Sequence, residues 1–148
     1  TLEDAVKCVT EAQLAGAHNY IIMDKEGRGC NIEAMSTRYQ IDWLDDDTIA
    51  HTNHCIVPQN HEVERERPPE SLQSSQKRLN RAQELLTKRP ITPETLMEIT
   101  RDNEAICVRS KPPLHVESCG AAIMRPASGD FWAVWGLPAE NEYEHFTL

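Results

Sequence analysis

Hydrophobic residues at the start of the chain recur at helical spacing. The apolar positions, and the glycine that follows them, are Leu2, Val6, Val9, Leu14 and Gly16. We predict a helix over residues 1–16 that ends at this glycine. Thr1 and Asp4 have the spacing of a capping box, with Asp where Glu or Gln is usual, so the helix should begin at Thr1.

A series of short strands is predicted next. Residues 19–23 form an apolar run rich in β-forming residues, residues 24–27 carry a turn signal, and residues 29–34 fit the returning strand. Residues 36–43 alternate enough to predict a third strand. Residues 48–51 are expected to form a short fourth strand.

The second half changes from helical patterns to strand patterns. Prolines and charges mark residues 58–70 as an exposed linker. Helices are predicted over residues 71–89, up to a proline, and from 92 to about 102. Three strands follow, at residues 105–109, 117–124 and 131–135. Because strands and helices are grouped rather than alternating, we predict an α+β fold in layers, with residues 1–148 as a single domain.

Net charge and cysteine content restrict the classes of partner. The formal net charge is −9, and a negative field repels phosphate, so neither nucleic acid nor an anionic membrane is an expected partner. No apolar run reaches the roughly 18 residues that a membrane helix needs. The five cysteines are odd in number and widely spaced, which favours reduced thiols and an intracellular location, cytoplasmic or peroxisomal. Because hydrophobic residues make up only 39%, either the core is modest or part of the apolar surface needs a partner segment.

Candidate chemistry concentrates in residues 51–55, HTNHC. Two imidazoles and a thiol can bind zinc, but this spacing is unusual for structural zinc and no second ligand pair lies nearby. A Cys55 thiol activated by histidine is another reading, although neighbours at a strand end often point to opposite faces. The amide of Asn53 is a neutral donor that suits a developing oxyanion. From composition alone, a strand-end turn in which Thr52 and Asn53 satisfy backbone groups explains the motif best.

Six segments, in this order, carry a resemblance to a known family. They are residues 17–24 (AHNYIIMD), 31–34 (NIEA), 51–55 (HTNHC), 106–109 (ICVR), 119–124 (CGAAIM) and 134–138 (VWGLP). Together they resemble the penicillin acyltransferase family of autoprocessing cysteine amidohydrolases. The matches spread over most of the chain, the HTNH core being the most specific, and the chain resembles the C-terminal portion of such an enzyme.

The resemblance implies a fold and a chemistry. The fold is the αββα sandwich of N-terminal-nucleophile hydrolases, with antiparallel sheets and flanking helices. A precursor cleaves itself before a cysteine, whose thiol attacks an amide or thioester carbonyl with its own α-amine as base. By position, Asn53 would be the catalytic oxyanion donor, and Asn19 and Arg109 would bind substrate. The family usually has the arginine directly after a cysteine, whereas Val108 separates Cys107 from Arg109.

The family's nucleophilic cysteine has no counterpart in these residues. The resemblance places it before the matched region, and none of the five cysteines has that context. Thr1 would act as a nucleophile only from the start of a strand, and it is predicted to cap a helix. We therefore expect the thiol on a missing N-terminal segment, and we expect no metal or cofactor.

The expected function is part of an enzyme acting on linear amides or acyl-CoA thioesters, with penicillin-like or β-alanyl amine substrates. The chain would supply oxyanion-hole and pocket residues. The alternatives are a non-catalytic module of the same fold and a small zinc protein. Glu33 fits either a site for a basic substrate group or a structural ion pair. Without its partner segment, the chain should expose apolar strand faces and unpaired edges.

Overall fold

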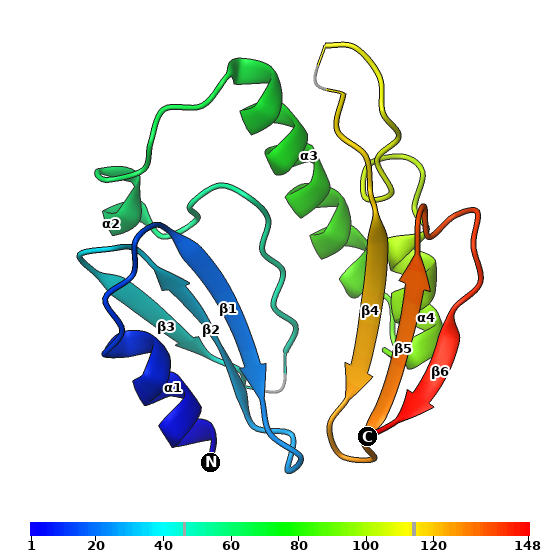
Figure 1. The fold of residues 1–148 in the computed structure, drawn as a ribbon, viewed down its shortest axis with the longest axis horizontal. Helices are drawn as coiled ribbons and strands as arrows, with labels where there is room; N and C mark the ends of the chain where they lie inside the picture. The colour runs from blue at the N-terminus through cyan, green and yellow to red at the C-terminus, as the bar shows by residue number, and fades with distance from the viewer. Residues whose placement is uncertain (46, 114) are drawn as a thin grey trace.

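The computed structural model describes residues 1–45, 47–113 and 115–148, and these residues form an α+β fold, as predicted. Two antiparallel sheets have the strand orders β1-β2-β3 and β4-β5-β6. Their strands are β1 (His18–Met23), β2 (Gly29–Ala34), β3 (Tyr39–Trp43), β4 (Gly120–Arg125), β5 (Asp130–Trp135) and β6 (Glu144–Thr147). The helices are α1 (Leu2–Thr10), α2 (Pro58–His61), α3 (Pro69–Leu86) and α4 (Pro93–Thr100). Figure 1 shows the two sheets standing apart, with the long helix α3 between them.

Helix α1 begins as its capping box predicts. The Asp4 N–H donates to Thr1 Oγ1 at 3.2 Å, and the Thr1 hydroxyl donates to Asp4 Oδ2 at 2.8 Å. The helix ends at Thr10, so the predicted end at residue 16 is wrong. The reason is tertiary packing: the chain leaves the helix so that Leu14 can reach the apolar core of the first sheet.

The first sheet has one apolar face and one polar face. Strand β2 is buried along its whole length. Its apolar residues Cys30, Ile32 and Ala34 pack against Val6, Val9, Leu14, Tyr20, Ile22 and Ile41, which come from α1, the segment after it, and the neighbouring strands. Successive residues of a strand point to opposite faces, so Asn31 and Glu33 face away from α1. Asn19 of β1 pairs with Glu33 in the antiparallel register and therefore shares that polar face.

Some predicted strands do not form. Residues 48–51 and 105–109 are irregular, and the strand predicted over residues 36–43 begins only at Tyr39. At residues 105–109 a side chain takes the place of a neighbouring strand, because Asp102 Oδ1 accepts from the N–H groups of residues 105 and 106 at 2.9 and 3.4 Å. Strand β6 was not predicted, since its four residues are too few to show an alternating pattern.

The predicted linker over residues 58–70 is more ordered than expected. It contains α2 and the first residues of α3. Asn60 in α2 is only 1% exposed, because its amide donates to the carboxylate of Glu33. The helix start at Thr92 is confirmed, with the Thr95 N–H donating to Thr92 Oγ1 at 3.2 Å.

One face of the second sheet is covered and the other is not. Ile123 of β4 and Val134 of β5 lie on the same face of the sheet, and they are 6% and 5% exposed. Residues of opposite parity face the other way, and there Met124, Trp135 and Phe146 are 65%, 89% and 44% exposed. Apolar strand faces are therefore exposed, as the sequence predicted. None of the helices described is long and apolar enough to cross a membrane.

Candidate functional site

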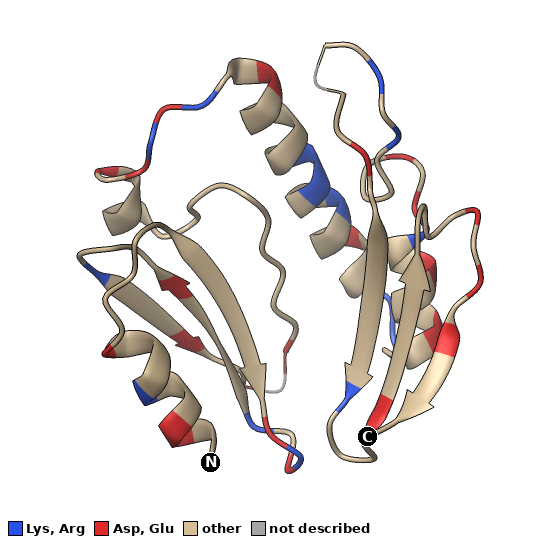
Figure 2. Cartoon of the chain, in the orientation of Figure 1, with Lys and Arg blue, Asp and Glu red and all other residues tan. Residues whose placement is uncertain are grey.

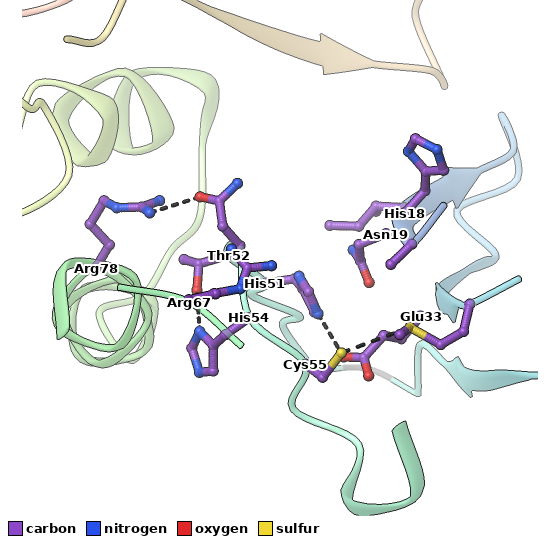
Figure 3. Close-up of a pocket in the computed structure, with 13 residues that line it drawn as sticks. His18, Asn19, Glu33, His51, Thr52, His54, Cys55, Arg67 and Arg78 are labelled. Atoms are coloured by element: carbon purple, nitrogen blue, oxygen red, sulfur yellow. Dashed lines mark hydrogen bonds and ion pairs between the residues drawn. The ribbon is translucent and has the colours of Figure 1, made fainter. Parts of the chain in front are cut away.

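A pocket of about 620 Å³ lies beside the polar face of the first sheet. Its walls come from β1, β2, residues 51–55 and the region of α3 (Figure 3). The lining residues that carry the argument below are Asn19, Glu33, Asn53, Cys55, Arg67 and Arg78. The pocket therefore joins segments that are far apart in sequence, including both residues 51–55 and the predicted Asn19.

The sheet contributes paired amide groups to the pocket wall. Asn19 Nδ2 donates to Asn31 Oδ1 at 2.6 Å. Among the residues that the structure describes, the buried Oδ1 of Asn19 has no hydrogen-bond partner. A buried acceptor without a donor is costly, so a group absent from these residues is expected to satisfy it.

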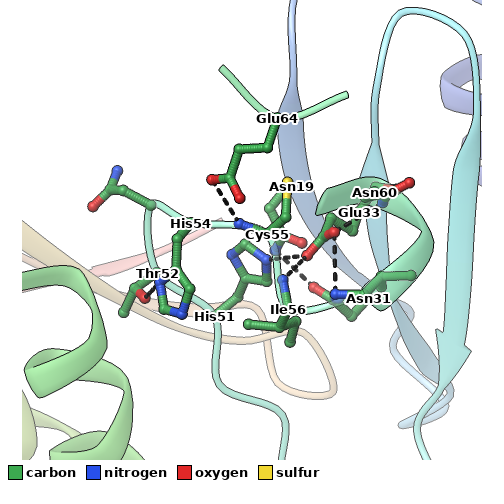
Figure 4. A network of polar contacts seen from close by, with 12 residues as sticks. Asn19, Asn31, Glu33, His51, Thr52, His54, Cys55, Ile56, Asn60 and Glu64 are labelled. Carbon is green, nitrogen blue, oxygen red and sulfur yellow. Dashed lines mark hydrogen bonds and ion pairs between the residues drawn. The ribbon is translucent and has the colours of Figure 1, made fainter. Parts of the chain in front are cut away.

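Glu33 is the centre of a buried network that shapes the floor of the pocket (Figure 4). The residue is 3% exposed. Its carboxylate accepts at 2.8 Å from His51 Nε2, Ile56 N–H and Asn60 Nδ2, and at 3.3 Å from Val57 N–H. Burial raises the pKa of this carboxyl, but the hydrogen bonds from Ile56, His51, Asn60 and Val57 outweigh it and lower the pKa below its usual value. The group is thus an anion whose acceptors are all in use, which supports a structural role.

Asn53 is held by two residues of α3. Its backbone N–H donates to the Ser75 hydroxyl at 2.9 Å, and its side-chain Oδ1 accepts from the guanidinium of Arg78 at 2.7 Å. Ser75 and Arg78 are three residues apart and therefore lie on the same face of the helix. Asn53 itself is exposed and lines the pocket.

The same serine holds the neighbouring histidine. Ser75 is 1% exposed, and its hydroxyl lies 2.8 Å from His54 Nδ1 and 3.1 Å from Thr52 Oγ1. Thr52 Oγ1 also donates to the backbone carbonyl of Ser75 at 3.1 Å. Burial lowers the pKa of His54, so its ring is neutral near neutral pH. Residues 52–54 are thus fixed to α3 on one side, and His51 is fixed to the sheet on the other.

Comparison with known proteins identifies the family of the chain. Residues 1–140 match the acyl-coenzyme A:6-aminopenicillanic acid acyl-transferase family. The chain belongs to this family. No individual curated protein gives a significant match. Membership of the penicillin acyltransferase family indicates an acyltransferase-like or amidohydrolase-like function.

Cys55 is a poor nucleophile for acyltransferase chemistry, although it lines the pocket. The residue is 6% exposed, and its thiol contacts Met35 Sδ at 3.8 Å. Burial, together with the nearby carboxylates of Glu33 and Glu64, raises the pKa of the thiol to about 12. Because the reactive form is the thiolate, this thiol is inert near neutral pH.

The zinc interpretation of the HTNHC motif has no support in the geometry. One ring nitrogen of His51 is bound to Glu33, and one of His54 to Ser75. Within the described parts of the chain, no group of three or more His, Cys, Asp or Glu side chains could hold a metal ion. The motif's polar atoms instead connect the sheet to α3.

The structure brings two of the three predicted site residues together. Asn19 and Asn53 both line the pocket, whereas Arg109 does not. Arg109 forms a surface ion pair with Glu140, a residue that follows strand β5 in the sequence. It is therefore not positioned to bind a substrate in this pocket.

Two residues of the site were missed in the sequence. Ser75 and Arg78 lie 22 and 25 residues after Asn53, which they contact. The sequence feature that could have indicated them is the i, i+3 spacing of this serine and arginine on the polar side of a predicted helix. Figure 2 shows basic residues gathered along the middle of α3.

Proposed function

We propose that this chain supplies the oxyanion-binding and substrate-lining part of a cysteine N-terminal-nucleophile amidohydrolase or acyltransferase. The observation that carries the proposal is the orientation of Asn53. Its amide oxygen is bound to Arg78, so its amide nitrogen is left to donate toward the pocket. Family membership supplies the reaction class.

In the proposed reaction a cysteine thiol attacks the carbonyl carbon of an amide or thioester. Its proton passes to the α-amine of the same cysteine, and the carbonyl oxygen becomes an oxyanion that accepts from Asn53 Nδ2. The tetrahedral intermediate then expels the amine or thiol as the α-amine returns the proton. The acyl-enzyme passes its acyl group to water or to an amine. Asn19 would lie near the nucleophile, where its unsatisfied Oδ1 can accept from an N–H group.

The thiol would come from polypeptide outside these residues, namely an N-terminal segment. Both sheets support this part of the proposal. The first sheet exposes Ile21 and Met23 on the face opposite α1, and the second exposes Met124 and Trp135 on the face opposite its buried residues. On the first sheet these apolar side chains lie beside the polar residues of the same face. Exposed apolar side chains of both sheets would be buried where the two layers of an αββα sandwich pack.

The family and the charge of the pocket support a proposed substrate class. We propose linear amides or acyl-CoA thioesters, with penicillin-like amides or β-alanyl amines as candidate amide substrates. The cation of Arg67 lines the pocket and suits a carboxylate on the substrate. Glu33 is saturated with donors and is therefore a poor site for a basic substrate group.

Mass spectrometry of a trapped acyl-enzyme tests the proposal. The active protein, meaning this chain together with the polypeptide that carries the thiol, is mixed with a thioester donor and quenched in acid. We expect one acyl group on a cysteine outside the 148 residues. Acylation of Thr1 or of Cys55 would contradict the proposed division of roles, and a protein that no donor acylates would be a non-catalytic module.

A further inference from the structure

We propose that Arg78 is a positioning residue for acyl transfer, which holds the Asn53 amide in the one orientation that can stabilise an oxyanion. This inference rests on the proposed function and extends it to a second residue. The carrying observation is the 2.7 Å hydrogen bond from the Arg78 guanidinium to Asn53 Oδ1.

The bond fixes which end of the amide faces the pocket. A guanidinium has only donors, so the group that faces it must be the amide oxygen. The two N–H groups of Asn53 must then point away from Arg78. Among the residues described, none accepts a hydrogen bond from Asn53 Nδ2, and Asn53 lines the pocket. An Asn with the opposite orientation would present an acceptor to the oxyanion and would repel it.

The arginine also limits the motion of an exposed side chain. Asn53 is exposed, so without a partner its side chain would sample several rotamers. The Ser75 hydroxyl holds its backbone at 2.9 Å, and Arg78 holds the tip of its side chain. Both contacts come from one face of α3, so a single rigid element determines the position of the donor. Charge on the guanidinium further polarises the amide and strengthens its N–H groups as donors.

Arg78 differs in this respect from the other arginine of the pocket. Arg67 Nε donates to the carboxylate of Glu64 at 3.2 Å and makes no hydrogen bond to Asn53. Arg78 is half-buried, and this burial lowers the pKa of its guanidinium. Arg67 therefore serves as a matched comparison: it offers a cation to the same pocket without contacting the proposed donor.

The test compares five variants of the active protein by kcat and KM. We expect Arg78→Met to lower kcat about 10-fold to 100-fold with little change in KM, because the donor loses its alignment. The double variant Asn53→Ala with Arg78→Met should be no slower than Asn53→Ala alone, since Arg78 acts through Asn53. Arg67→Met removes a proposed binding charge from the same pocket, so it should raise KM and show how a loss of substrate binding looks. Lys77→Met, which removes a cation of α3 outside the pocket, should change neither constant.

Several outcomes would overturn the inference. If Arg78→Met raises KM alone, and Arg67→Met does the same, Arg78 is a binding charge. If the losses in the double variant multiply, the two residues act independently. Arg78→Lys keeps a donor and should recover part of kcat, whereas a fully inactive Arg78→Lys would count against the hydrogen bond. Should Arg78→Met fail to fold, the neutral and helix-compatible Arg78→Gln repeats the measurement.

The same data separate this inference from the proposed function. If Asn53→Ala is slow and Arg78→Met retains full kcat, only the role of Arg78 fails. If Asn53→Ala retains full kcat, the proposed oxyanion donor is wrong, and the role of Arg78 fails with it.

Discussion

Replacing Glu33 by glutamine should destabilise the protein severely, although the two side chains have the same shape. The carboxylate is 3% exposed and accepts four hydrogen bonds, two at each oxygen. Glutamine has one oxygen and one NH₂ group, so two of the donors must face another donor. Rotation of the glutamine amide changes which pair of donors faces its oxygen, but it cannot give both pairs an acceptor.

The magnitude follows from those contacts. A hydrogen bond to a charged group contributes about 1.5–3 kcal/mol, and a buried donor left without an acceptor costs about 1–3 kcal/mol. His51 can exchange its tautomer and recover one contact, but the backbone N–H of Ile56 or Val57 cannot. We therefore expect Glu33→Gln to lower the free energy of unfolding by about 3–5 kcal/mol.

The pH dependence gives an independent check. The pKa of Glu33 is lowered in the folded protein from its ordinary value of 4.5, so the unfolded chain binds this proton more readily. The stabilisation is complete above pH 4.5 and is lost as the pH falls through the lowered pKa of the folded state. Glu33→Gln removes the titrating group, so its free energy of unfolding should fall less on acidification than that of the original protein.

Urea unfolding of the active protein measures both effects. The control is Glu62→Gln, because Glu62 pairs with Arg38 at the surface and its side chain is 73% exposed. The control should change the free energy of unfolding by no more than about 0.5 kcal/mol. A Glu33→Gln variant as stable as this control, with unchanged acid sensitivity, would refute the structural role of Glu33.

Three further predictions concern α3, the thiols and the exposed sheet. Ser75→Ala should lower the free energy of unfolding by about 1–3 kcal/mol, measured in urea, whereas Ser74→Ala should have little effect because no described residue is hydrogen-bonded to its hydroxyl. Iodoacetamide at mildly alkaline pH should alkylate the exposed Cys119 and spare Cys55, whose thiol pKa is raised to about 12, as read by mass spectrometry; equal labelling would contradict its burial. Iodide should quench the fluorescence of Trp135 in the 148-residue chain but not in the active protein. The fluorescence of Trp135 is obtained as the difference between each protein and its Trp135→Phe variant. Equal quenching in both would show that no segment covers this face.

Features determined by neighbouring residues could be predicted from the sequence. The capping box at Thr1 and the cap at Thr92 each need only a residue three positions later, and both form. Strand β2 has the bounds predicted for it, because a turn and a glycine define its start. The HTNH motif also led to Asn53 through the family resemblance, and Asn53 lines the pocket.

Features determined by distant contacts could not be predicted. Residues 48–51 have a strand-like pattern, but the following backbone N–H groups are satisfied by Glu33 and Ser75 instead of a strand. Arg109 follows a cysteine closely enough to suggest the family pattern, yet its partner is Glu140, 31 residues later. The role of Arg78 could not be assigned from the sequence, because only folding brings Arg78, rather than Arg81 of the same helix, to Asn53.

Single-turnover kinetics of Asn53→Ala test the central claim most directly. The active protein and the variant are each mixed, in excess, with a limiting amount of a thioester donor, and the rate of acyl-enzyme formation is followed. We expect the variant to acylate about 10²-fold to 10³-fold more slowly, with nearly unchanged donor binding, because the lost N–H group acts on the oxyanion alone. Acylation at the original rate would mean that Asn53 does not stabilise the oxyanion.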